Sequence, residues 1–129
     1  MRILQFLTAA LLSTFALAAS KKGTDKFQTF HSKAVSSSPI DLDDAGYEHL
    51  TSAPRDYSVA VLLTAQEAKY GCQLCRDFHP EWSVLGSSWA KGDKKGESRM
   101  IFGTLDFAKG KGTFQKVIPH GTELQIAAD

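Results

Sequence analysis

Apolar residues along this chain follow two periods, which predict alternating strands and helices. Two continuous apolar runs, 58–65 and 99–107, are typical of strands buried on both faces. Between them, apolar residues from Leu74 to Trp89 recur at intervals of 4, 4, 3 and 4, the spacing of one helix face. We expect the aromatic residues of this stripe to pack in the core. Strands that alternate with helices predict an α/β domain with parallel strand pairing.

Shorter signals complete the predicted order of elements. Apolar spacing within 27–34 predicts a short helix, and a serine run ending at Pro39 reads as a linker. Residues 40–42 suit a short strand, and Asp43 is a suitable N-cap for a helix after it. A last helix is expected to include 113–117. The predicted order is therefore helix, strand, helix, strand, helix, strand, helix.

The N-terminal residues have the pattern of a secretory signal peptide. A basic start at Arg2 precedes an apolar run that ends in the A-x-A cleavage pattern of residues 16–18. This run is shorter than the roughly 20 residues of a membrane span. We therefore predict that residues 1–19 are removed on entry to the secretory pathway.

The charge balance gives no support to a nucleic-acid-binding or acidic-lipid-binding protein. Cleavage removes Arg2 and no acid, which leaves the 14 acidic residues balanced by an equal number of basic ones. Basic patches that bind phosphate backbones normally give a domain a clear positive charge. We predict no nucleic-acid partner.

The stretch YGCQLCRDFHPEW, residues 70–82, holds the only two cysteines, Cys72 and Cys75. They follow an apolar strand and begin the predicted helix. Free N–H groups and the helix dipole at such an N-terminus stabilise a thiolate, which thiol–disulfide exchange requires. The placement favours a reversible redox pair in which Cys72 attacks and Cys75, one turn later, resolves the mixed disulfide.

Two other interpretations of the cysteine pair remain open. A structural disulfide is possible in an oxidising compartment, although a loop this short constrains the unfolded chain only slightly. A structural zinc site needs four ligands. The histidines that could complete it do not form a second close pair, so the sequence predicts neither a metal nor another cofactor. They are His31, His49, His79 and His120.

Four segments in order resemble a known family. PRDYSVAVLLTA, YGCQLCRDFHPEW, SWAKGDK and FGTLDFAKGKGTFQK are together similar to the lumenal thioredoxin-like domain of the redox subunits of the eukaryotic oligosaccharyltransferase complex, especially fungal ones. Pro80, five residues after Cys75, fits the helix of thioredoxins. The resemblance implies an α/β, thioredoxin-like fold for 39–129, after a signal peptide at 1–19 and an N-terminal helix and linker at 20–38.

The resemblance also implies a role. Such subunits act in the endoplasmic reticulum lumen, where Cys72 and Cys75 would form transient mixed disulfides with nascent glycoproteins while another subunit transfers the glycan. The implied partners are nascent glycoprotein polypeptides and other oligosaccharyltransferase subunits. This chain would be an accessory thiol–disulfide oxidoreductase and not the glycosyltransferase.

The resemblance further implies that the sequence ends early. Family members continue into a strand that follows a cis-proline, and then into membrane helices. We therefore expect a sheet that is incomplete at the C-terminus, a strand at 99–107 that lacks part of its expected neighbourhood, and membrane attachment only through a region absent here. The alternatives are a free secreted oxidoreductase and a non-catalytic peptide-binding module with a structural disulfide.

Overall fold

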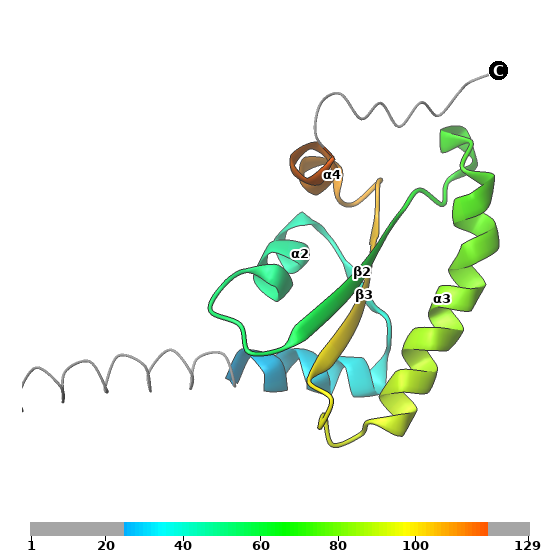
Figure 1. Cartoon of the computed structure of the whole chain (residues 1–129). Helices are drawn as coiled ribbons and strands as arrows, with labels where there is room; N and C mark the ends of the chain where they lie inside the picture. The colour runs from blue at the N-terminus through cyan, green and yellow to red at the C-terminus, as the bar shows by residue number, and fades with distance from the viewer. Residues whose placement is uncertain (1–24, 119–129) are drawn as a thin grey trace, which may run out of the picture.

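A computed structural model describes residues 25–118 and shows a three-stranded parallel sheet between helices (Figure 1). The α/β, thioredoxin-like fold with an incomplete sheet and the predicted order of elements are confirmed. The signal-peptide prediction for 1–19 lies outside the described residues. The elements are a helix at 25–36, β1 (Ile40–Leu42), α2 (Asp44–Thr51), β2 (Ser58–Thr64), the 3-10 helix η1 (Ala68–Tyr70), α3 (Gln73–Gly92), β3 (Met100–Asp106) and α4 (Lys111–Val117).

The strand order β1-β3-β2 corrects two predictions. β3 is the central strand and pairs in parallel with a strand on each side, so the expectation that 99–107 lacks part of its neighbourhood is wrong as regards strand pairing. β2 is an edge strand whose residues 59–63 are only half-buried, so its predicted burial on both faces is also wrong. The reason is topological. The chain leaves β2, continues through α3 and returns as β3 between the two earlier strands, which leaves β2 at the edge.

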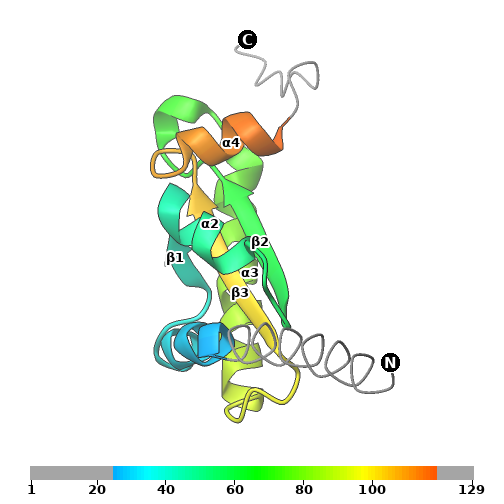
Figure 2. The same cartoon turned by 90° about the vertical axis from the view of Figure 1, so that its left-hand side faces the viewer.

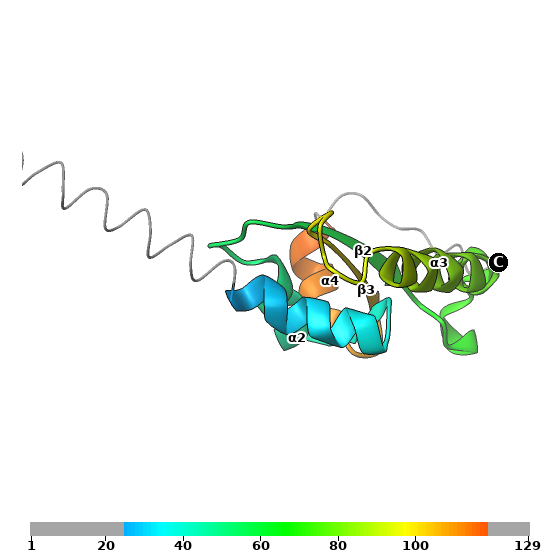
Figure 3. The same cartoon turned by 90° about the horizontal axis from the view of Figure 1, so that it is seen from below.

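The core lies on one face of the sheet, under the 25–36 helix, α2 and α4. Figure 2 shows α2 and α4 in front of the sheet and α3 behind it, and Figure 3 shows the 25–36 helix beside α2. Phe30 of that helix contacts the ring of His49 at 5.1 Å between centroids. Asp43 caps α2 as predicted, because its carboxylate accepts a hydrogen bond from the N–H of Gly46 at 2.7 Å. The buried core residues are Phe27, Phe30, Ala34, Leu42, Leu50, Tyr57, Ile101 and Leu105.

α3 covers the opposite face of the sheet and contacts it chiefly through β3. The Trp82 indole donates a hydrogen bond to Thr104 Oγ1 at 3.0 Å and packs against Phe102. The prediction that the aromatic residues of the stripe pack in the core is nevertheless wrong for Phe78 and Trp89, whose side chains are exposed. Most large side chains of the stripe are exposed, because no described strand lies beyond β2 beneath that side of the helix. The exposed fractions are 77% for Leu74, 44% for Phe78, 47% for Leu85 and 39% for Trp89.

Candidate redox site

The cysteine pair lies where the chain passes from β2 into α3. After η1, Gly71 has φ +64°, a left-handed conformation that glycine adopts without strain. Cys72 is then the N-cap of α3 and Cys75 lies in its first turn. The two are joined by a disulfide with 5.3 Å between their Cα atoms. Both residues are half-buried, so burial does not separate the expected attacking cysteine from the resolving one.

The local geometry suits a thiolate at Cys72. Its Sγ accepts a hydrogen bond from the backbone N–H of Cys75 at 3.2 Å, in the place that a serine or aspartate oxygen takes in most N-caps. The first turn of α3 carries no acidic residue. Arg76 supplies a positive charge one turn after Cys72, and its Nη2 donates to Gln73 Oε1 at 2.7 Å. A helix N-terminus and a nearby cation both favour the ionised form of a thiol.

Gln66 ties the cysteine segment to the sheet, a role that the sequence did not predict. Its Nε2 donates to the carbonyl oxygen of Cys75 at 2.9 Å and to Oγ1 of the buried Thr64 at 2.6 Å. Its backbone N–H donates to the Asp106 carboxylate at 2.9 Å. The ends of β2 and β3 therefore hold the first turn of α3. The sequence signal that could have identified this anchor is a polar side chain placed between a strand and the CxxC pair.

Replacing Gln66 with leucine should lower the free energy of unfolding by about 1–2 kcal/mol, because Thr64 and the carbonyl of Cys75 lose a donor in a half-buried place. Denaturant unfolding at neutral pH measures this. Gln73→Leu is the matched control, since its amide bonds only to exposed side chains on α3. Equal losses for the two variants would show that Gln66 does not anchor the helix.

The histidines do not assemble a metal site in the part of the chain that the structure describes. His31 lies stacked on Phe27, with its Nε2 3.2 Å from the carbonyl oxygen of Asp93. His79 lies on α3, and His120 is outside the described residues. Within 25–118, no three His, Cys, Asp or Glu side chains are grouped so that they could hold a metal ion.

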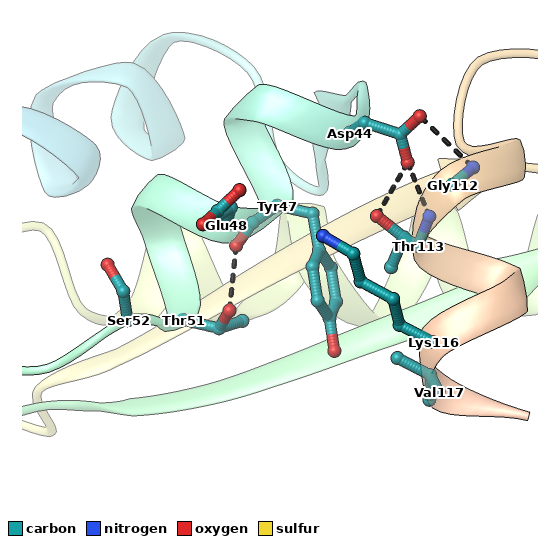
Figure 4. A pocket seen from close by; sticks show the side chains of 9 residues that line it. All are labelled: Asp44, Tyr47, Glu48, Thr51, Ser52, Gly112, Thr113, Lys116 and Val117. Carbon is teal, nitrogen blue, oxygen red and sulfur yellow. Dashed lines mark hydrogen bonds between the residues drawn. The ribbon is translucent and has the colours of Figure 1, made fainter. Parts of the chain in front are cut away.

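A separate pocket of about 320 Å³ lies between α2 and α4 (Figure 4). Its lining includes neither cysteine. Asp44 at its edge accepts hydrogen bonds from the N–H and Oγ1 of Thr113 at 2.7 and 2.6 Å, and from the N–H of Gly112 at 3.2 Å. These donors, the Thr113 hydroxyl first, hold the pKa of Asp44 below its ordinary value. Asp44 therefore joins the start of α2 to the first turn of α4.

The lowered pKa predicts a pH-dependent contribution to stability. A carboxyl group whose folded pKa is depressed stabilises the fold above its unfolded pKa of about 3.9, and this stabilisation is lost as pH falls through the folded pKa. Asp44→Ala should therefore be less stable than the natural chain at pH 7, and the difference should shrink below about pH 4. Urea unfolding at both pH values measures it. A difference that does not change with pH would contradict the role of the charged carboxylate.

The part of the chain within 25–118 contains no helix that is both long and apolar enough to cross a membrane.

Comparisons with known proteins place the chain in a family. The model of the OST3 / OST6 family, transporter family, matches residues 26–120. The chain is similar to proteins called dolichyl-diphosphooligosaccharide–protein glycosyltransferase subunit MAGT1, being 35% identical over 66 residues to that of Xenopus laevis and 34% identical over 77 residues to that of Homo sapiens. These matches cover 51% and 59% of this chain, but only 20% and 23% of the relatives. Because the family model matches well over half of the sequence, the chain belongs to the OST3/OST6 family.

Proposed function

We propose that this chain is a thiol–disulfide exchange module of the oligosaccharyltransferase complex, which holds nascent glycoproteins in the endoplasmic reticulum lumen through Cys72. The observation that carries the proposal is the N-cap position of the Cys72 sulfur, with the Cys75 N–H directed at it. The names of the relatives support the complex as the place of action. The family match supports the assignment to this class of subunit.

Holding a client needs no net oxidation or reduction. A client thiolate attacks Cys72 Sγ of the disulfide, the bond between Cys72 and Cys75 breaks, and Cys75 leaves as a thiolate. Release is the reverse: Cys75 attacks Cys72 Sγ, the disulfide forms again and the client thiolate leaves. The short connection between the cysteines keeps Cys75 close to Cys72 throughout, so release follows soon after capture.

Exposed apolar side chains lie beside the reacting sulfur. Leu74, between the two cysteines, is 77% exposed, and Phe78 one turn later is 44% exposed. An unfolded polypeptide exposes apolar side chains, and these can pack against an exposed apolar surface of this kind. The same helix turn thus offers a reactive sulfur and an apolar contact to a client that has not yet folded.

The proposal is tested in cells that lack their own member of this family. The chain, supplied with the membrane region of a relative, should raise glycan occupancy at acceptor sites near cysteines, as measured by mass spectrometry of glycopeptides. A Cys72→Ser, Cys75→Ser double variant should fail at those sites. If the double variant restores occupancy fully, the chain acts as a non-catalytic binding module. If neither protein restores occupancy but both reach the complex, the proposed role is wrong.

A further inference from the structure

The hydrogen bond that closes the first turn of α3 is long. The backbone nitrogen of Arg76 lies 3.4 Å from the carbonyl oxygen of Cys72, whereas the equivalent bonds of α2 and α4 measure 2.9 and 3.0 Å. Protein N–H···O bonds normally measure about 2.7–3.2 Å between the heavy atoms. The turn that carries both cysteines is therefore held less firmly by its own backbone than the first turns of α2 and α4.

Pro80 weakens the connection between this turn and the rest of the helix. Proline has no N–H, so it cannot donate to the carbonyl of Arg76 four residues earlier, and its ring crowds that carbonyl. Both effects fall where the cysteine turn joins the body of α3. The first turn thus receives less support from the helix that follows it than an ordinary first turn does.

Gln66 supplies support from the sheet. Its Nε2 carries two protons, and it donates one to the carbonyl oxygen of Cys75 at 2.9 Å and the other to Oγ1 of the buried Thr64 at 2.6 Å. The backbone N–H of Gln66 is fixed as well, because it donates to the Asp106 carboxylate at 2.9 Å. Cys75 is therefore held by its carbonyl, while its N–H donates to the sulfur of Cys72.

We propose that Gln66 is a positioning residue that stabilises the reduced form of the cysteine pair and so raises its reduction potential. The proposal rests on the proposed function for the role of the pair, but its test needs only a small-molecule thiol. In the oxidised form the Cys72–Cys75 disulfide itself closes the first turn of α3. In the reduced form this covalent link is gone, and the hydrogen bond from Gln66 keeps Cys75 in the turn.

The first turn must stay formed if the reduced pair is to gain from its position. A thiolate at Cys72 is stabilised by the Cys75 N–H and by the dipole of α3, and both effects are lost where the turn frays. The oxidised form frays less, because the disulfide limits how far the two residues can separate. Loss of the Gln66 donor therefore destabilises the dithiol more than the disulfide. Stabilising the reduced form raises a reduction potential, so this loss lowers it.

Equilibration with glutathione measures the effect. Two glutathione thiols give two electrons to the Cys72–Cys75 disulfide and become one glutathione disulfide. Their protons pass to the cysteine sulfurs, or to the buffer where Cys72 remains a thiolate. The full chain, purified after secretion, is equilibrated at known ratios of the two glutathione forms, and reduced thiols are counted by alkylation and mass spectrometry. Gln66→Leu should lower the equilibrium constant for reduction by about tenfold, or about 30 mV.

Thr104→Val is the matched control. The Thr104 hydroxyl accepts from the Trp82 indole at 3.0 Å, so this variant also loses a hydrogen bond between α3 and the sheet, but beyond Pro80. It should destabilise the oxidised and reduced forms equally and leave the potential unchanged. Thr64→Val is a second test variant, because it removes the hydroxyl that fixes the Gln66 amide. It should lower the equilibrium constant by about threefold.

The outcomes separate a positioning role from a structural one. A lower equilibrium constant in Gln66→Leu and Thr64→Val, with no change in Thr104→Val, supports the proposal. If Gln66→Leu loses equal stability in both redox forms and keeps its potential, Gln66 is only a structural anchor and the proposal is wrong. An equal shift in Thr104→Val would overturn it as well, because general loosening of α3 would then explain the result. If Gln66→Leu does not fold, the comparison of Thr64→Val with Thr104→Val decides in the same way.

Failure of the proposed function would look different. A natural chain whose disulfide resists the glutathione pool would contradict client exchange, and the variants would then be compared in dithiothreitol buffers. A shift between them would still show that Gln66 positions the pair. An unchanged potential in Gln66→Leu and Thr64→Val, with a natural chain that exchanges readily with glutathione, would overturn only the role of Gln66.

Discussion

Replacing Cys75 with serine should make the chain accumulate covalent, reductant-sensitive adducts with secretory proteins. This variant cannot form the Cys72–Cys75 disulfide, so a client thiolate has no disulfide to attack; instead its Cys72 thiolate attacks a client disulfide, forms the mixed disulfide and expels a client thiolate. In the natural chain, where capture starts from the Cys72–Cys75 disulfide, Cys75 lies one turn away in α3 and releases the client by attacking Cys72. Without this intramolecular step, adducts should rise on the order of tenfold or more, since only external thiols can release them. Non-reducing electrophoresis after rapid acid quenching measures the adducts.

Cys72→Ser is the control for the roles of the two sulfurs. It leaves Cys75 inside the first turn of α3, away from the N-cap position that stabilises a thiolate, so adducts should be few. Both residues are half-buried, which makes the N-cap position and not exposure the basis of this prediction. Equal amounts of adduct from the two variants would contradict the assignment of Cys72 as the attacking sulfur and Cys75 as the resolving one. Adducts from neither variant would favour a structural disulfide.

Replacing Gly86 with alanine should lower the free energy of unfolding by about 1–3 kcal/mol, through overpacking. An added Cβ would lie 2.5 Å from Cγ, 2.7 Å from Cδ and 2.9 Å from the backbone N of Pro39. The ring of proline is rigid and its nitrogen is part of the backbone, so α3 must move away from the segment before β1. Such a movement would also loosen the contact of Trp82 with β3.

Gly92→Ala is the matched control on the same helix. A Cβ there has no other atom within 4 Å, and alanine stabilises a helix interior relative to glycine by about 1 kcal/mol, and by less near a helix end. The two substitutions should therefore shift the urea midpoint in opposite directions. If both stabilise the chain, Pro39 and α3 do not pack as closely as the structure shows.

The sequence predicted the order of elements because the signals for them are local. The apolar period, the serine run before Pro39 and the Asp43 cap depend on neighbours in the chain, and the elements that they predict form where expected. Which strand occupies the centre depends on contacts distant in sequence. β2 and β3 have similarly apolar sequences, so the pattern could not show that β3 returns between the other two strands.

The same limit applies to the candidate site. The CxxC spacing and its place before a helix located Cys72 and Cys75 correctly at the start of α3. The Gln66 anchor was not predicted, because its partners include a backbone carbonyl nine residues away. The exposure of the α3 stripe was also missed. Its helical spacing shows that one face is apolar, but not whether other parts of the chain cover that face.

The reduction potential of the Cys72–Cys75 disulfide tests the central claim most directly. The chain is equilibrated in glutathione buffers of known potential, and the fraction of reduced thiol is measured by alkylation and mass spectrometry. A pair that exchanges with clients should have a potential of roughly −180 to −270 mV, within the range of known thiol–disulfide oxidoreductases. A value well below about −300 mV would mean a disulfide that resists the glutathione pool, and it would contradict the assignment of Cys72 and Cys75 as a redox pair.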